Sequence, residues 1–246
     1  MSARLPGAGS ILFLLLGLAI HHVPETPFDP LIGAGLIVLL ALPSYFVLAR
    51  SEGMGRALAL ITGLSLLSMT VEAIGVMAGV PYGSFHYGEA IGSATIGPVP
   101  WTVGFAYVPL LLGACALAGQ YLPERSLRVR AGASALLLVV ADLVLDPGAA
   151  LLGFWTWAEP GAYYGIPVSN YVGWLITGTA YSALTLSVIR HPLPVSVATS
   201  LLLITSFWTG VALGAGMVAP LAIGLCLIGF AATTLALGRG RTPCRL

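Results

Sequence analysis

Residues 57–79 read ALALITGLSLLSMTVEAIGVMAG, and the side chain of Glu72 is the one charged group in this run. A helix of about 20 mostly apolar residues is long enough to cross the hydrocarbon core of a bilayer. Inside lipid the backbone must satisfy its own hydrogen bonds, which favours a helix over irregular structure. This stretch therefore predicts a membrane-spanning helix that carries a carboxyl group.

The rest of the chain has the same character. Hydrophobic residues make up 58% of the 246 residues and charged residues 8%, whereas soluble domains average about 25% charged residues. The composition predicts an all-α, polytopic transmembrane bundle that forms a single integral membrane domain over residues 1–246. The first apolar run lacks a clean cleavage site, so we read it as a helix and not as a signal peptide. The expected spans are residues 6–23, 31–49, 57–79, 101–119, 127–147, 169–190, 194–213 and 217–237.

The basic residues of the chain are ten arginines and no lysine. With eight spans, all ten arginines fall on one side of the bilayer, and the positive-inside rule makes that side the cytoplasm. A seven-span alternative would leave the three C-terminal arginines outside. We therefore expect a multi-pass protein of the cell membrane with both termini in the cytoplasm. The two long loops, residues 80–100 and 148–168, then lie on the non-cytoplasmic side.

Three carboxyl groups, those of Glu72, Asp142 and Asp146, fall inside the expected spans and in their outer halves. An ionised acid at the bilayer centre costs about 2.5–3.5 kcal/mol on insertion scales, so such residues are functional candidates. The alternative is structural: these acids could join helices, and Asp146, which precedes Pro147, could mark a helix end. Asp142 and Asp146 are four residues apart and share a helix face. Two carboxylates this close in a dry site do not both ionise cheaply, so the pair retains a proton and could act as an acid.

The two long loops are rich in aromatic residues. Residues 80–110 and 151–174 hold 13 of the 22 aromatic residues. An interfacial aromatic belt is the alternative explanation, but a belt would enrich both faces of the membrane. Asn170 could be a helix cap and His86 an ordinary loop histidine, and neither the histidines nor the cysteines have the spacing of a metal site. The candidate substrate-binding residues are Tyr82, His86, Tyr87, Trp101, Trp155, Trp157, Tyr164 and Asn170.

Several functional classes can be weighed on the residues alone. A retinal protein needs a Schiff-base lysine, which this chain lacks. No basic stripe indicates nucleic-acid binding. A membrane prenyltransferase would use aspartate-rich motifs to hold a diphosphate, and Asp142-x-x-x-Asp146 supplies half of such a pair, on the side away from the arginines. A proton-coupled carrier of a lipophilic substrate also fits buried acids.

Four segments carry a resemblance to a known family: EAIGVMAGVPYGSFHY (72–87), DLVLDP (142–147), WTW (155–157) and YYGIPVSN (163–170). They resemble the carotenoid hydratase family of membrane proteins, over about residues 60–190. In that family, archaeal members are bisanhydrobacterioruberin hydratases, and bacterial members hydrate the acyclic end of gamma-carotene or lycopene. The resemblance implies the addition of water to a terminal gem-dimethyl double bond to give a tertiary alcohol. It makes the C50 carotenoid bisanhydrobacterioruberin, hydrated to bacterioruberin, the favoured substrate.

The chemistry implied by this resemblance suits the residues. An isolated alkene is a poor base and needs a positioned acid, and the cation that protonation leaves can be stabilised by aromatic faces. We expect the Asp142/Asp146 pair to donate the proton and Glu72 to act as the base, although the sequence leaves the reverse assignment open. No metal or redox cofactor is required. The expected partners are the carotenoid, water, the bilayer and other membrane enzymes of the carotenoid pathway.

Overall fold

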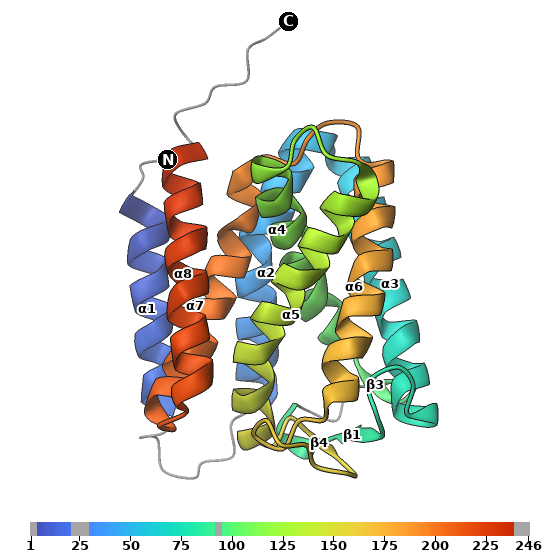
Figure 1. Cartoon of the computed structure of the whole chain (residues 1–246), viewed down its shortest axis with the longest axis vertical. Coiled ribbons are helices and arrows are strands. Elements are labelled where there is room, and N and C mark those ends of the chain that lie inside the picture. Colours follow the sequence, from blue (N-terminus) through green and yellow to red (C-terminus); the bar gives the residue numbers. More distant parts are fainter. Residues whose placement is uncertain (1–3, 21–29, 92–94, 239–246) are drawn as a thin grey trace, which may run out of the picture.

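The protein is a bundle of eight α-helices (Figure 1), seen in a computed structural model that describes residues 4–20, 30–91 and 95–238. The expected all-α polytopic fold is confirmed. Six helical segments, those containing α2, α3, α4, α5, α7 and α8, are long and apolar enough to cross a membrane. The helices are α1 (Arg4–Ile20), α2 (Pro30–Glu52), α3 (Met54–Ala78), α4 (Val103–Tyr121), α5 (Leu127–Leu151), α6 (Val168–Val188), α7 (Thr199–Gly214) and α8 (Val218–Gly238).

The bundle has an apolar exterior as well as an apolar interior. Large side chains such as Leu31, Leu39, Phe46 and Leu66 are more than half exposed on the outer helices, which suits a surface that lipid covers. The helices α4 and α7 are the most buried and form the centre of the bundle. Apolar side chains therefore make up much of the core and much of the outer surface.

The helix α1 packs closely along α7 because glycines allow it. A Cβ atom at Gly17 would collide with the carbonyl oxygen of Phe207, and one at Gly210 would collide with that of Leu14. Closer to the start of α1, the hydroxyl groups of Ser10 on α1 and Ser206 on α7 lie 2.6 Å apart. Small residues of this kind are what allows membrane helices to approach one another.

The end of the bundle that carries the short strands closes over the helices (Figure 1). Strand β1 (Phe85–Tyr87) pairs antiparallel with β4 (Trp155–Trp157), with Phe85 opposite Trp157 and Tyr87 opposite Trp155. The two aromatic loops, about 70 residues apart in the chain, are thus joined to each other. After the 3₁₀ turn η1 (Glu89–Ile91), β2 (Thr95–Ile96) pairs with β3 (Val99–Pro100).

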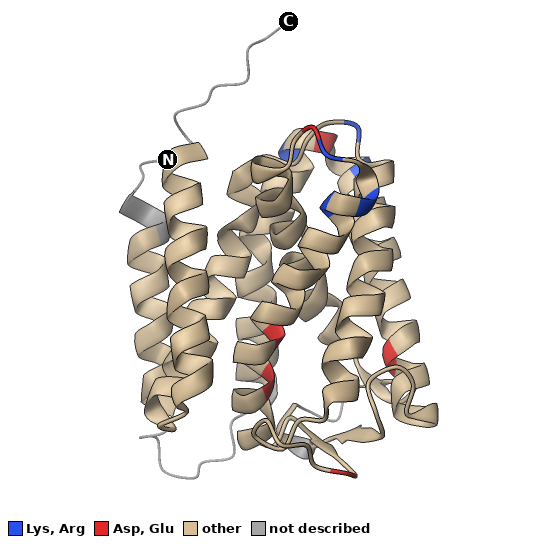
Figure 2. Ribbon diagram, in the orientation of Figure 1, with Lys and Arg blue, Asp and Glu red and all other residues tan. Residues whose placement is uncertain are grey.

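The arginines occupy the opposite end of the bundle. Figure 2 shows the coloured arginines at the end of the bundle away from the strands, where α2 and α6 end and α3 and α5 begin. There, the buried carboxylate of Glu52 accepts the backbone N–H groups of Arg190 (3.2 Å) and His191 (3.3 Å) and pairs with Arg56 at 3.3 Å. These contacts fix the end of α6, and with it the helix that carries part of the candidate site. The 3₁₀ turn η2 (Val195–Ala198) then leads into α7.

Candidate active site

Three buried polar side chains meet between α5 and α6. Asp142 and Asp146 lie one turn apart on α5, and Asn170 lies in the first turn of α6. The amide nitrogen of Asn170 donates to Oδ2 of Asp142 at 2.9 Å and to Oδ2 of Asp146 at 2.5 Å. All three residues are at most 3% exposed. Asn170 therefore clamps the two acids of the predicted pair with one amide group.

This geometry decides between two alternatives that the sequence left open. Asn170 is not a helix cap, because α6 begins after Pro167 and the amide side chain is engaged with the two acids. Asp146 does not mark a helix end either. The helix α5 continues through Pro147 to Leu151, so the expected end at residue 147 is wrong by about one turn. Proline inside a membrane helix is tolerated because neighbouring groups satisfy the freed backbone positions.

The carboxyl groups of Asp142 and Asp146 lie within hydrogen-bonding reach of each other. Two ionised carboxylates have no proton to share, so this contact is a hydrogen bond only when one acid is protonated. The second oxygen of Asp142, Oδ1, is buried and has no partner among the described residues. A proton on the pair remains a prediction from the sequence, and it would let one carboxyl group donate to the other.

The third acid, Glu72 on α3, has its own donor from the loop above it. The hydroxyl group of Tyr87 donates to Oε2 of Glu72 at 3.1 Å. Burial raises the pKa of Tyr87 well above its usual value, and the neighbouring carboxyl group of Glu72 raises it further. Tyr87 therefore stays protonated at any ordinary pH and acts only as a donor to Glu72.

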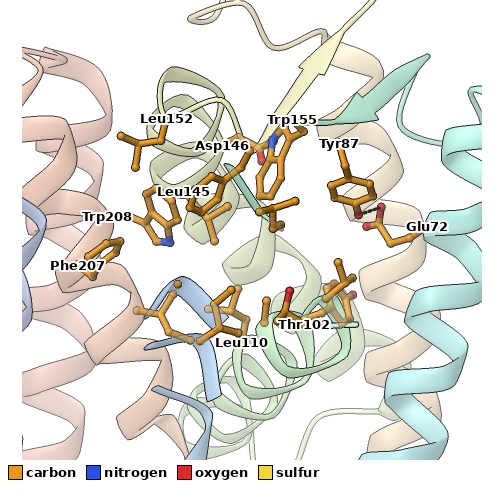
Figure 3. Close-up of a pocket in the computed structure, with 18 of the residues that line it drawn as sticks. Glu72, Tyr87, Thr102, Leu110, Leu145, Asp146, Leu152, Trp155, Phe207 and Trp208 are labelled. Carbon is orange, nitrogen blue, oxygen red and sulfur yellow. Dashed lines mark hydrogen bonds between the residues drawn. The ribbon is translucent and has the colours of Figure 1, made fainter. Parts of the chain in front are cut away.

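The paired strands connect the two acidic centres. Tyr87 and Trp155 are cross-strand partners, and their rings meet edge to face with centroids 6.3 Å apart. While Tyr87 donates to Glu72, Trp155 lies beside Asp146 in the view of Figure 3, and both line the same cavity. The β1–β4 ribbon thus supplies a hydrogen-bond donor to the acid on α3 and an aromatic neighbour to an acid on α5.

A cavity beneath the ribbon brings these groups together (Figure 3). It contains about 1160 Å³ of unfilled space, counting its open mouth, and its walls are mostly aromatic and aliphatic. Glu72 and Asp146 both reach this cavity, with Trp155 between them in the view of Figure 3. The predicted site residues that line it are Glu72, Tyr82, Tyr87, Asp146, Trp155, Trp157 and Asn170.

Four predicted site residues lie outside the cavity wall. Asp142 does not line the cavity itself, but it is hydrogen-bonded to Asn170, which does, as does Asp146. His86 is exposed, because neighbouring strand residues point to opposite faces and Phe85 and Tyr87 take the inner one. Trp101 packs against Phe105 with ring centroids 5.7 Å apart. Tyr164 is 41% exposed and accepts a 3.4 Å hydrogen bond from the backbone of Ala219.

The cavity also has lining residues that the sequence analysis did not select. Phe154 and Trp174 belong to the aromatic-rich segments and could have been chosen on that signal. Phe207 and Trp208 on α7, and a group of aliphatic residues on α2, gave no signal. In a membrane span, an apolar residue that faces a cavity has the same type as one that faces lipid. The α2 residues are Gly33, Leu36, Ile37 and Leu40.

The loop that follows β4 is anchored beside the acid pair. The hydroxyl group of Tyr163 donates to the backbone carbonyl of Leu143 at 2.9 Å. Burial raises the pKa of Tyr163 to about 12, so it too remains a donor. This bond holds the loop against α5, one residue beyond Asp142.

The positions of the acidic and basic side chains bear on whether the site could bind a diphosphate or a metal ion. The acids lie towards the strand end of the bundle, and the coloured arginines lie at the other end (Figure 2). A diphosphate at Asp142 and Asp146 would therefore find no arginine beside it among the described residues, which disfavours the prenyltransferase alternative. The described residues also contain no group of three or more His, Cys, Asp or Glu side chains placed to hold a metal ion.

Comparisons with known proteins give two matches. The model of a family described as carotenoid biosynthesis protein matches residues 31–231. The chain is also similar to a bisanhydrobacterioruberin hydratase of Haloarcula japonica, at 35% identity over 178 residues, which is 71% of this chain and 59% of that protein. The chain thus spans 59% of the length of this relative. No solved structure matches the chain. The family match extends beyond residues 60–190 to include α2, α7 and part of α8, which supply cavity wall or pack beside it.

Proposed function

The chain belongs to the family of carotenoid biosynthesis proteins, and from this premise we propose that it adds water to the terminal gem-dimethyl double bond of an acyclic carotenoid. The product is a tertiary alcohol. The observation that carries the proposal is the pair of carboxyl groups, Glu72 and Asp146, that reach one apolar, aromatic cavity. The name of the Haloarcula japonica relative supports bisanhydrobacterioruberin as the substrate.

The cavity suits the end of a polyene. Its wall combines aliphatic side chains from α2 and α4 with aromatic side chains from both loops, α6 and α7. A hydrocarbon end group that leaves the lipid for such a site stays in apolar surroundings, so its binding depends on close packing against the wall. Cavities of this kind commonly hold a lipophilic ligand and orient it with a few polar groups.

Proton transfer begins the proposed reaction. Asp146 donates its proton to the CH carbon of the terminal double bond, and positive charge develops on the carbon that carries the two methyl groups. The carboxylate left on Asp146 keeps its hydrogen bond from Asn170. In this proposal Asp142 is protonated as well, and it donates a hydrogen bond to that carboxylate. The clamp and the pair therefore stabilise the charge that the step creates on the enzyme.

The tertiary cation is held by the aromatic wall of the cavity. Trp155 and Tyr87 meet edge to face over the two acids. A desolvated cation near an aromatic face gains up to about 2 kcal/mol. Stabilising the cation in place lets it live long enough for water to reach it before it loses a proton.

Water capture completes the reaction. The oxygen of a water molecule bonds to the cationic carbon, and Glu72 takes one of the water protons while it holds its hydrogen bond from Tyr87. The proton then returns from Glu72 to Asp146, so the net change is one water added. No oxidant, reductant or nucleotide takes part. In the reverse assignment, Glu72 would donate and Asp146 would accept.

We also propose that the arginine end of the bundle faces the cytoplasm. The positive-inside rule favours this orientation, and the arginines coloured in Figure 2 share one end. The carotenoid end would then react in the outer half of the cell membrane, beneath the β1–β4 ribbon.

The test is expression in a host that makes an acyclic carotenoid with unhydrated ends, followed by mass analysis of the pigments. We expect a product heavier by the mass of one water for each hydrated end. The substitutions Glu72→Gln and Asp146→Asn should abolish it, while Glu159→Gln, at an exposed loop acid, should not. Wild-type protein that makes no alcohol from any acyclic carotenoid defeats the proposal.

Deuterated water separates the acid from the base. If Asp146 is the acid, Glu72→Gln leaves proton transfer intact, and the recovered alkene gains deuterium. Asp146→Asn should give neither alcohol nor deuterium. The opposite pattern assigns the acid to Glu72.

A further inference from the structure

The hydroxyl group of Thr102 is a polar group in the cavity wall with no partner in the protein. Thr102 lines the cavity, is 1% exposed, and its Oγ1 has no hydrogen-bond partner among the described residues. The residue stands directly before α4, where a threonine commonly caps the helix with its side chain. Its backbone carbonyl accepts the N–H groups of Phe105 (2.9 Å) and Ala106 (3.0 Å), but its hydroxyl makes no cap hydrogen bond.

The other polar groups around the cavity are mostly committed to the protein. Glu72 accepts from Tyr87, and Asn170 donates to the two aspartates. Tyr82 donates to Thr177 at 3.3 Å. Besides Thr102, one more hydroxyl of the wall, that of Tyr107, has no partner by hydrogen-bond geometry among the described residues, and it faces Thr177. Thr102 therefore keeps both its donor and its acceptor capacity for a molecule in the cavity.

We infer that Thr102 binds the water molecule that becomes the hydroxyl group of the product, an inference that rests on the proposed hydration. Thr102 lies across the cavity from Asp146 and Trp155 in the view of Figure 3, with Glu72 to one side. A water molecule there donates one hydrogen to Oγ1 of Thr102 and the other to the carboxylate of Glu72. Its lone pair is then free to face the cation.

This placement has a stereochemical consequence. Asp146 delivers its proton from one wall of the cavity, and the water held by Thr102 attacks from the opposite wall. The new C–H and C–O bonds therefore form on opposite faces of the double bond. The water must be held in this way, because the rest of the cavity wall is largely apolar and does not retain water by itself.

When this water is absent, we expect the cation to lose a proton again. Protonation by Asp146 still gives the tertiary cation, which then loses a proton to Glu72. Loss of a proton from the newly formed CH₂ group returns the substrate. Loss from a methyl group gives an isomer with a terminal methylene double bond. Both outcomes conserve all atoms and release no alcohol.

The experiment compares Thr102→Val, which keeps the shape of the side chain without its hydroxyl group, with Thr102→Ser, which keeps the hydroxyl. Both are assayed in deuterated water at early times. We expect Thr102→Val to lower alcohol formation about tenfold or more, as loss of one hydrogen bond in the transition state would. Deuterium should still enter the recovered carotenoid or its methylene isomer. Thr102→Ser should restore most of the alcohol.

The outcomes separate this inference from the proposed function. Wild-type protein that makes no alcohol defeats the hydratase proposal itself. Wild-type activity in Thr102→Val, or loss of alcohol together with loss of deuterium entry in a variant that still purifies as folded protein, overturns the role of Thr102. If the valine variant does not fold, Thr102→Ala is measured against Thr102→Ser by the same ratio of deuterium entry to alcohol.

Discussion

Replacing Asn170 with leucine tests the clamp on the acid pair. Leucine has a similar volume but no donor, so the change removes the hydrogen bonds to Asp142 (2.9 Å) and Asp146 (2.5 Å) without opening a cavity. In the proposed reaction, Asp146 becomes a carboxylate as it gives up its proton. Asn170 then stabilises a charge that is present in the transition state and absent before it.

The size of the effect follows from that hydrogen bond. A hydrogen bond to a charged group contributes about 1.5–3 kcal/mol, and about 1.4 kcal/mol corresponds to a factor of ten in rate. Asn170→Leu should therefore slow alcohol formation roughly 10- to 150-fold. The buried carboxyl groups also lose their donor, which should lower the free energy of unfolding by about 1–3 kcal/mol for each group left unsatisfied.

The assay is the initial rate of alcohol formation by purified protein in carotenoid-loaded liposomes, normalised to folded protein. Thr179→Val is the matched control, since the hydroxyl of Thr179 lies on the exposed side of the same helix and bonds only to the carbonyl of Leu175 at 2.7 Å. The control should keep the wild-type rate. An Asn170→Leu rate within twofold of wild type would refute the role of the clamp.

Three further predictions concern the ribbon and the topology. Tyr87→Phe removes the donor to Glu72 but keeps the ring, so alcohol formation should fall about tenfold with little change in melting temperature. The control His86→Ala, on the exposed face of the strand, should match wild type. Equal rates for both variants would contradict the role of Tyr87. Gly88→Ala places a Cβ atom against the backbone of the neighbouring loop and should lower the melting temperature by several degrees; an unchanged melting curve would mean that the loops are not joined in this way. A cysteine placed at Glu159 should react with a membrane-impermeant thiol reagent added outside intact cells, and labelling only after lysis would reverse the proposed orientation.

The helices could be read from the sequence because length and hydropathy determine them. The expected span 57–79 corresponds to α3 (Met54–Ala78), which ends where Gly79 adopts a left-handed conformation (φ 70°) and donates to the carbonyl of Gly75 at 2.8 Å. The expected span 169–190 likewise corresponds to α6 (Val168–Val188). Such boundaries depend on local chemistry, which the sequence contains.

The candidate site could be predicted only in part. The acids were identifiable because a carboxyl group inside an apolar span is costly. The contributions of Phe207 and Trp208 were not, because membrane helices lack the polar outer face that would reveal which residues point inward. The choice between His86 and Tyr87 depends on which face of β1 turns inward, and pairing with β4 determines that.

That pairing makes the site depend on strand register. Tyr87 donates to Glu72 and Trp155 lines the cavity beside Asp146, and the two residues are opposite each other on the inner face of the ribbon. Because side chains alternate along a strand, a slip of one residue would exchange an inner residue for an outer one. The donor to Glu72 would then be replaced by an exposed neighbour such as His86. Glu72 therefore has its donor and Asp146 its aromatic neighbour only when both loops are folded and correctly paired, although the acids themselves lie on the helices α3 and α5.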